Sequence, residues 1–242
     1  SIGARNVLTY DYAYARANPT SAGTNPGNLY IIGGCTNGTV GCSNYSNSIY
    51  KCDINTSGVP GGCTTTGQLQ INDATDPNNG NSDCGSGLGA MAGTVYANYI
   101  YLIGGLTPSC TDLTTLRYAK FDNSNNIVAV SGSAWIQSPM QTHVGRRRGA
   151  AFGYNGYIYV VGGYDGGQGL LDDIEFAKIN VSDGSLVDES GGQNLFNVSS
   201  VTLDQSRWGL SVPVSNSYAY VIGGCTSGNA PTCNTGGSDA TI

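Results

Sequence analysis

The sequence predicts an all-β protein, and three observations carry that prediction. A short tyrosine-rich strand that ends in Gly-Gly occurs four times, in "GNLYIIGG", "NYIYLIGG", "NGYIYVVGG" and "SYAYVIGG". Glycine supplies 37 of the 242 residues and charged residues only 11%, whereas helical proteins favour Ala, Leu, Glu and Lys in periodic runs. Aromatic and β-branched residues recur at regular intervals between polar turns, which indicates many short strands rather than a disordered chain.

The Gly-Gly stops mark an internal repeat. Their second glycines stand at positions 34, 105, 163 and 224, so the interval varies between 58 and 71 residues, as in a repeat architecture with variable loops. Glycine is expected there because the strand must turn sharply at its end, and glycine reaches positive φ without a Cβ penalty. The alternation of Tyr with Ile and Val predicts that these strands are buried on both faces.

Further strands recur around each Gly-Gly strand. The clearest copy, residues 135–190, contains "WIQSPM", "RRRGAAFGYN", "GYIYVVGG" and "DIEFAKIN", which turn residues divide into four strands. The segments "SIYKCDI", "LRYAKFD" and "IEFAKIN" align around an aromatic residue at Tyr50, Tyr118 and Phe176. Ahead of the Gly-Gly strand, Arg16 and Arg207 align with Arg148, which predicts a repeat arginine that bonds backbone carbonyls.

This pattern resembles the kelch repeat: a hydrophobic strand ending in Gly-Gly, an aromatic residue about 13 positions later, and a tryptophan after the next turn. Only Trp135 occupies the place of that late tryptophan. The resemblance implies a kelch-like β-propeller of about four four-stranded blades, a single domain over residues 1–242. Either the two ends of the chain share the last blade, or the chain belongs to a larger or partner-closed propeller.

The eight cysteines predict disulfides. None lies in a CxxC motif, so structural zinc is not expected, and low charge with an even cysteine count favours an oxidising, extracellular compartment. Cys35 and Cys225 each follow Gly-Gly and precede a second cysteine, which predicts the local bridges Cys35–Cys42 and Cys225–Cys233. Cys52 and Cys63 flank a turn-rich segment that a hairpin would close. Cys84 and Cys110 remain as the fourth pair.

Charge and hydropathy exclude two classes of partner. A net charge of −6 argues against nucleic acid, and no apolar run approaches the roughly 20 residues of a membrane helix. The even cysteine count, the low charge and the abundance of Asn, Ser and Thr lead us to expect a secreted or surface-displayed protein. Five Asn-X-Ser/Thr sequons are either glycosylation sites or chance products of an Asn-, Ser- and Thr-rich chain; they begin at Asn37, Asn44, Asn55, Asn180 and Asn197.

No catalytic residue is predicted. His143 is the only histidine, so neither zinc nor copper sites built on several histidines are expected, and its local sequence offers no nucleophile or acid partner. Paired carboxylates are the one enzymatic alternative. A carbohydrate-active enzyme would bring Asp172, Asp173 or Glu175 together with Arg148 in one pocket, whereas a binding module would leave these acids apart and solvated. Asp188 and Glu189 form a second acidic pair.

The candidate binding residues are Arg146, Arg147, Arg148, Tyr164 and Asp165. The arginine run suits a carboxylate or phosphate, although plain loop charge is the simpler interpretation for Arg146 and Arg147. No cofactor is expected; Asp73, Asp76 and Asp83, in a loop with Asn78 and Asn81, form a weak calcium candidate.

Three functions follow from these features. The first is a non-catalytic binding or structural module that recognises a protein or glycan through its loops. The second is the carbohydrate-active enzyme. The third is self-assembly, in which the subunits of an extracellular polymer complete each other's blades.

Overall fold

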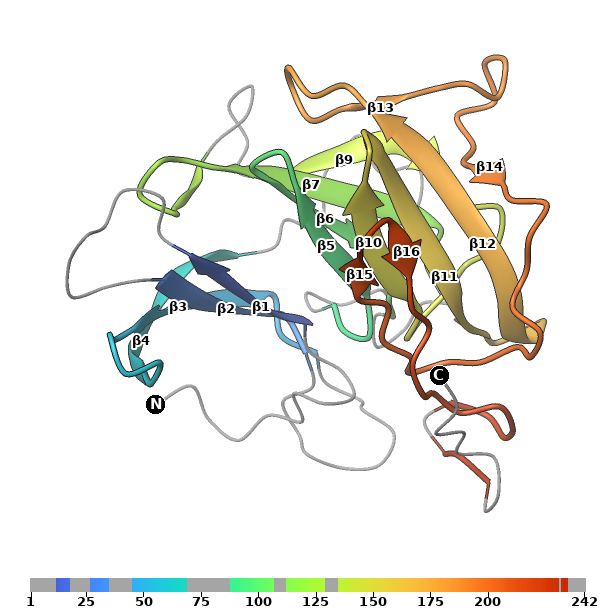
Figure 1. Cartoon of the computed structure of the whole chain (residues 1–242), viewed down its shortest axis with the longest axis horizontal. Helices are drawn as coiled ribbons and strands as arrows, with labels where there is room; N and C mark the ends of the chain where they lie inside the picture. The colour runs from blue at the N-terminus through green and yellow to red at the C-terminus, as the bar shows by residue number, and fades with distance from the viewer. Residues whose placement is uncertain are drawn as a thin grey trace. The chain divides into compact units, whose positions relative to one another are not determined.

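The computed structural model describes residues 12–17, 27–34, 45–68, 88–106, 112–128, 135–230 and 232–234, with the backbone alone for 12–17 and 67–68. Every helix or strand in these ranges is a β-strand, so the all-β prediction is confirmed for them (Figure 1). The strands are β1 (Tyr12–Ala17), β2 (Gly27–Ile32), β3 (Ser48–Ile54), β4 (Pro60–Gln68), β5 (Ala92–Tyr96), β6 (Tyr99–Ile103), β7 (Thr115–Phe121), β8 (Ile127–Val128), β9 (Ile136–Gln141), β10 (Ala150–Tyr154), β11 (Tyr157–Asp165), β12 (Gly169–Ile179), β13 (Leu186–Val187), β14 (Asn197–Val198), β15 (Val214–Ser215) and β16 (Tyr218–Ala219).

These strands form four sheets, and each sheet contains one Gly-Gly strand. The orders are β1-β2-β3-β4, β5-β6-β7-β8 with β9 beside β7, β10-β11-β12-β13 with β14 beside β12, and β15-β16. The Gly-Gly strands β2, β6 and β11 therefore lie between two neighbours. Among the described residues the fourth, β16, has a neighbour on one side only.

The repeat read from the sequence and the sheet of the structure are offset by one strand. "WIQSPM" was expected to open the third unit, but its strand β9 pairs with β7 of the second sheet. In the third sheet the same place beside β12 is taken by β14, which follows the next turn. The strand between two Gly-Gly units thus closes the preceding sheet.

All eight glycines of the Gly-Gly stops have positive φ, as predicted. Gly104 and Gly105 have φ of 64° and 106°, and Gly162 and Gly163 have φ of 55° and 115°. In three repeats the second glycine donates its N–H over 2.8 Å to a carbonyl of the following repeat, from Gly34 to Leu88, Gly105 to Arg146 and Gly163 to Arg207. This hydrogen bond, here called the Gly-Gly junction, joins each of these three Gly-Gly strands to the chain that enters the next repeat.

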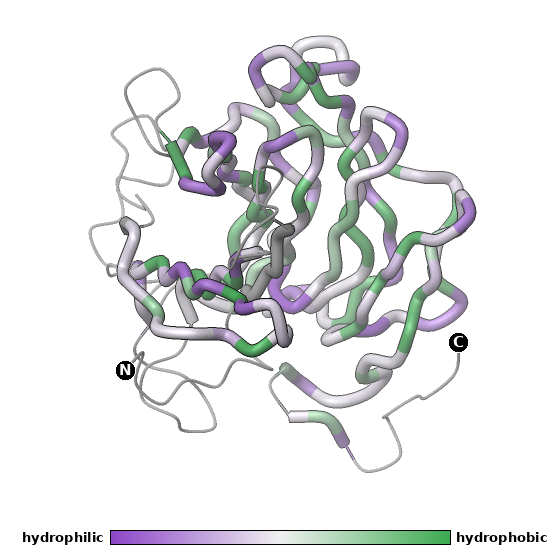
Figure 2. Tube along the Cα trace, turned by 60° about the vertical axis from the view of Figure 1, so that its left-hand side comes forward, coloured by the Kyte–Doolittle hydropathy of each residue, from purple (hydrophilic) through white to green (hydrophobic). Residues whose placement is uncertain are grey.

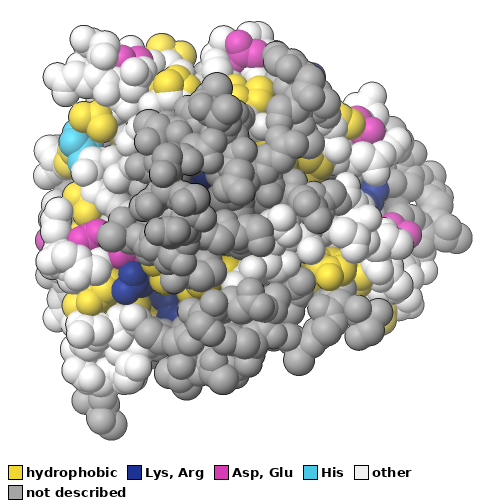
Figure 3. All heavy atoms as spheres, turned by 180° about the vertical axis from the view of Figure 1, so that it is seen from behind, with side chains coloured by type: hydrophobic (Ala, Val, Ile, Leu, Met, Phe, Trp, Pro, Cys, Tyr) yellow, Lys and Arg dark blue, Asp and Glu magenta, His cyan; other side chains and the backbone are white. Residues whose placement is uncertain are grey.

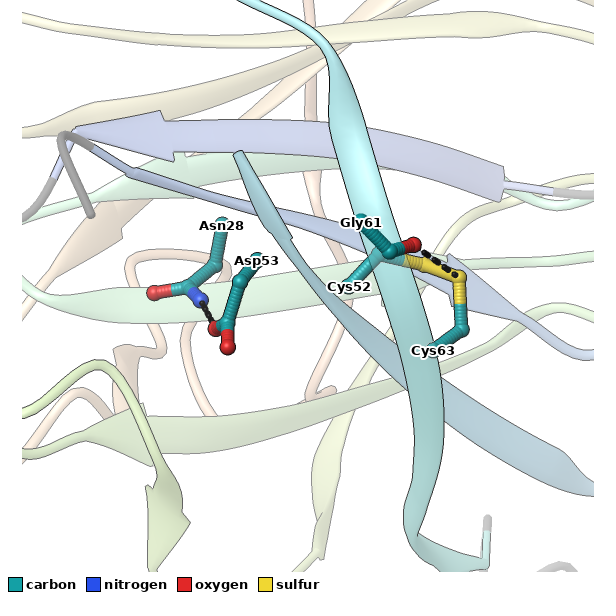
Figure 4. Close-up of a disulfide and its surroundings, with 5 residues drawn as sticks. All are labelled: Asn28, Cys52, Asp53, Gly61 and Cys63. Carbon is teal, nitrogen blue, oxygen red and sulfur yellow. Dashed lines mark hydrogen bonds between the residues drawn. A yellow bond between two sulfur atoms is a disulfide. The ribbon is translucent and has the colours of Figure 1, made fainter. Parts of the chain in front are cut away.

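The chain divides into two compact units. The first holds β1–β4 together with residues 119–136. In it, Cys52 of β3 and Cys63 of β4 form one expected disulfide, with Asn28 Nδ2 donating to Asp53 Oδ1 over 2.7 Å nearby (Figure 4). The Tyr30 ring packs against Phe121 at 5.1 Å between centroids. The single domain over residues 1–242 stays a prediction.

The second unit holds residues 91–106, 111–118 and 137–242. Here β15 and β16 lie in front of β10 and β11 (Figure 1), and their packing buries Ala150 and Val161 against Leu210 and Val212. Hydrophobic residues follow the strands and hydrophilic ones the turns (Figure 2). β6 is buried along its whole length, as expected of a Gly-Gly strand.

A second expected disulfide, Cys225–Cys233, follows the fourth Gly-Gly strand. Cys225 packs with Tyr164 and Trp208 in a small apolar cluster. The predicted pairs of Cys35 with Cys42 and Cys84 with Cys110 lie outside the described residues.

Candidate functional site

The polar centre of the second unit forms between the chain that enters β10 and the strand β12. Residues 142–149 connect β9 to β10 and carry His143 and the three arginines. Side chains alternate in direction along a strand, so Asp173 and Glu175 of β12 share one face. That face meets residues 142–149, which brings oppositely charged groups together.

Arg146 is the centre of this cluster and is fully buried. Its Nη1 donates to Asp173 Oδ1 at 3.0 Å and to the Gly162 carbonyl at 3.1 Å, and its Nη2 donates to Asp173 Oδ2 at 2.8 Å. Nη2 also donates to Glu175 Oε1. Two carboxylates and a backbone carbonyl therefore surround a single guanidinium. The expectation that Arg146 is a plain loop charge is wrong.

Glu175 is as completely buried as Arg146. Its second oxygen, Oε2, accepts hydrogen bonds from the backbone N–H of His143 and pairs with its Nδ1, both at 2.9 Å. Burial raises the pKa of the Glu175 carboxyl above its ordinary value, although Arg146 and the two bonds from His143 act in the opposite direction. The local sequence around His143 could not predict that Glu175 is its acid partner, because Glu175 lies 32 positions further along the chain.

The raised pKa of Glu175 predicts a pH dependence of stability. The folded protein holds the Glu175 proton more tightly than the unfolded chain, whose pKa for this group is 4.5. Between 4.5 and the folded pKa, this carboxyl therefore lowers the free energy of unfolding as the pH rises. Denaturant unfolding across that range is expected to give a flatter pH profile for Glu175→Gln than for the wild type. Parallel profiles would contradict the shift.

Arg147 makes a separate ion pair. Its Nη1 donates to both oxygens of Asp112, at 2.5 and 2.7 Å, and its guanidinium lies 4.7 Å from the centroid of the Tyr164 ring. Asp112 Oδ2 also accepts the N–H of Gly166 at 2.6 Å. Burial raises the pKa of Asp112, while Arg147 lowers it. Arg147 thus holds Asp112 in the position where it accepts the Gly166 N–H of the turn after the third Gly-Gly. The expectation that Arg147 is a plain loop charge is also wrong.

Arg148 is not the repeat arginine that the sequence alignment predicts. Arg146 Nη1 bonds the Gly162 carbonyl and Arg207 Nη1 bonds the Gly223 carbonyl, each 16 positions further on, at 3.1 and 3.0 Å. The Gly-Gly junctions give the same register, since Leu88, Arg146 and Arg207 provide the accepting carbonyls. The repeat position is therefore Arg146, two residues before the expected one.

The backbone conformation of Arg148 recurs at the equivalent position of two other repeats. Arg148 has φ of 57°, and the residues at the same place in the neighbouring repeats, Ala90 and Gly209, have φ of 59° and 70°. Its guanidinium lies 4.9 Å from the ring centroid of Trp208. Because the left-handed conformation recurs at this place, it belongs to the turn that leads into each sheet.

The five candidate binding residues form no open cationic site. Arg146 and Arg148 are buried, the Arg147 side chain is 15% exposed, and Tyr164 is buried with its hydroxyl bonded to Asn229. Asp165 Oδ1 accepts the N–H groups of the turn residues Gly167 and Gln168. On the part of the face in Figure 3 that the structure describes, Lys and Arg atoms show only in small groups.

The acidic residues fit neither arrangement expected from the sequence. Asp173 and Glu175 converge, but on Arg146 instead of Arg148, while Asp172 is exposed. Asp188 accepts N–H groups of Ser190, Gly192 and Asn194, which lowers its pKa, chiefly through Ser190. Asp188 therefore closes a loop.

A cavity of about 620 Å³ lies beside the fourth Gly-Gly strand. Its walls come from β12, from residues 201–207 and from residues 219–221. Arg207 and Asp204 are the charged residues of the lining, which also includes Tyr220, Val221 and Leu203. Among the described lining residues Asp204 is the single carboxylate, whereas most glycoside hydrolases use two flanking acids.

Among the described residues no three His, Cys, Asp or Glu side chains gather in a group that could bind a metal ion, and the calcium candidate at Asp73, Asp76 and Asp83 lies outside them. In the ranges that the structure describes, no helix has the length and apolarity to cross a membrane.

No protein-family model matches the chain, and no curated protein matches it.

Proposed function

We propose that this chain is a kelch-like propeller module that binds a protein or glycan and has no catalytic activity. The observation that carries the proposal is that Asp173 and Glu175 of β12 are both hydrogen-bonded to Arg146. Arg146 binds both oxygens of Asp173 and one oxygen of Glu175, and His143 binds the other. Carboxylates with all their oxygens engaged inside the protein are poorly placed to protonate or attack a substrate.

The Gly-Gly junctions support the propeller part of the proposal. Blades of a propeller are small antiparallel sheets that pack on one another, and each must be joined to the next at a fixed place. The junctions at Gly105 and Gly163 have the same length, and the turns that follow them share a positive φ. The partner would meet the loops between strands, where rigid β scaffolds place recognition.

Secretion or surface display is part of the same proposal. The disulfides Cys52–Cys63 and Cys225–Cys233 are compatible with an extracellular location. Together with the low charge content, they suit a module that works outside the cell.

The test combines a binding assay with an activity assay. We expect the labelled chain to bind members of a glycan or extracellular-protein array, and to release no product from a panel of glycosides. The Asp204→Asn variant removes the carboxylate that the described residues contribute to the cavity, and it is expected to leave array binding through the loops unchanged. Glycoside hydrolysis that Asp204→Asn abolishes, with an unchanged circular dichroism spectrum, would overturn the proposal.

A further inference from the structure

Three of the five sequon asparagines lie in the part of the chain that the structure describes: Asn55, Asn180 and Asn197. The other two, Asn37 and Asn44, lie outside it. N-glycosylation attaches a bulky, hydrated group to the side-chain nitrogen Nδ2, and a folded protein accommodates that group where Nδ2 faces solvent. The surroundings of the three Nδ2 atoms therefore decide which of these sequons is compatible with a glycan.

Two of the three nitrogens are engaged with carboxylates. Asn197 is partly buried in β14, where it pairs with Phe176 of β12, and its Nδ2 donates to Glu189 Oε2 at 3.5 Å. Asn180 is partly buried at the end of β12, and its Nδ2 donates to Asp183 Oδ2 at 3.1 Å. A sugar on either nitrogen would displace a hydrogen bond that holds the side chain in place.

Asn55 presents its nitrogen differently. It is exposed at the start of the turn between β3 and β4, and residues 56–60 are exposed as well. Its Oδ1 accepts the N–H groups of Ser57 and Val59 at 3.0 and 2.9 Å, so the oxygen side of the amide faces the turn. Nδ2 lies on the opposite side of the planar amide, and among the described residues no group accepts a hydrogen bond from it.

The backbone holds Asn55 in this orientation. Its N–H donates to the Val59 carbonyl at 3.0 Å, and its carbonyl accepts the Gly58 N–H at 2.9 Å. Gly58 has φ of 77°, a conformation that closes the turn without a Cβ penalty. The side-chain oxygen and the main chain therefore fix the asparagine together, and the nitrogen is the part of its amide that stays available.

The sequence around Asn55 also suits modification. Ser57 supplies the hydroxyl of the sequon, and Asn55 is the one sequon asparagine with an acid two positions earlier, Asp53, which offers a cationic enzyme site a second group to bind. Residues 55–68 contain no charged side chain, so a glycan at the start of this segment would displace no ion pair of its own.

We infer that Asn55 carries an N-linked glycan, whereas Asn180 and Asn197 stay unmodified. The donor is a lipid-linked oligosaccharide pyrophosphate. Nδ2 forms a bond to C1 of its first sugar, the bond from C1 to the pyrophosphate oxygen breaks, and the lipid pyrophosphate leaves while Nδ2 loses one proton. The inference rests on the proposed secretion or surface display, because such glycans occur on secreted proteins.

The test is glycopeptide mass spectrometry of the protein purified from its natural source, with electron-transfer fragmentation to locate the sugar. We expect a glycan on Asn55 and unmodified side chains at Asn180 and Asn197. Fragmentation also distinguishes the asparagine from the hydroxyl groups of Thr56 and Ser57 in the same turn.

Two variants of that turn, produced in the same source, form a matched pair. Ser57→Ala removes the sequon hydroxyl but keeps the backbone N–H that bonds Asn55 Oδ1, and it is expected to lower the occupancy of Asn55 at least about tenfold. Thr56→Ala removes the neighbouring exposed hydroxyl and leaves the sequon complete, so the occupancy is expected to stay unchanged.

Four results would overturn the inference: an unmodified Asn55 in the secreted protein, a glycan on Asn180 or Asn197, a sugar located on Thr56 or Ser57 instead of Asn55, or equal occupancy in the two variants. The array and hydrolysis assays require no glycan on Asn55. A chain that binds array members with Asn55 unmodified would therefore overturn this inference and leave the proposed function standing.

Discussion

Replacement of Arg146 by methionine is expected to lower the free energy of unfolding by about 3–5 kcal/mol, the usual cost of removing one partner of a buried ion pair. The loss arises because Glu175 would remain fully buried without its cation, and Asp173 would lose its two-bond partner. Equilibrium unfolding in urea, followed by tryptophan fluorescence, measures the change.

The matched control for Arg146→Met is Lys178→Met. Lys178 Nζ lies 3.7 Å from Glu189 Oε1, and its side chain is 50% exposed. An exposed ion pair of this kind contributes at most about 1 kcal/mol, so a small change is expected. Equal losses for the two variants would show that Arg146 is not the counter-ion of the buried Glu175 carboxylate.

The Gly104→Ala variant is expected to lose about 2–5 kcal/mol, because two costs add. A Cβ at Gly104 would lie 2.2 Å from the Arg146 carbonyl oxygen and 3.1 Å from that of Leu113, which forces the Gly-Gly junction apart. The residue also has φ of 64°, a conformation that costs L-residues roughly 1–2 kcal/mol.

Gly156→Ala separates these two costs. Gly156 has φ of 84°, but no heavy atom lies within 4 Å of a Cβ built there, so only the conformational cost of about 1–2 kcal/mol is expected. Thermal and urea unfolding of the two variants give the comparison. If Gly104→Ala lost no more stability than Gly156→Ala, the close contact at the junction would not exist.

Local patterns predicted the parts of this protein that local physics controls. The Gly-Gly stops, their positive φ and the buried strand before Gly104 follow from residue type and alternation. The disulfide Cys52–Cys63 could be predicted because the two cysteines flank a hairpin turn. In each case the residues that decide the structure are close together in the sequence.

The charged cluster could not be predicted, because its partners come from different strands. Arg146 meets Asp173 and Glu175 across 27 and 29 positions, and the one-strand offset of the sheets decides which arginine faces them. An alignment by the letters "RRRG" chose Arg148, two residues away from the position that bonds Gly162. Asp173 and Glu175 alternate as one strand face should, and that was the available signal for their convergence.

A double-mutant cycle between Arg146 and Glu175 tests the central claim most directly, namely that Glu175 of β12 serves as a buried counter-ion of Arg146 and not as a catalytic group. The free energy of unfolding is measured for the wild type, Arg146→Met, Glu175→Gln and the double variant. We predict coupling of about 1–3 kcal/mol, with the double variant more stable than Arg146→Met, because neither charge of the pair then remains buried alone. Effects that add to within about 0.5 kcal/mol would contradict the claim.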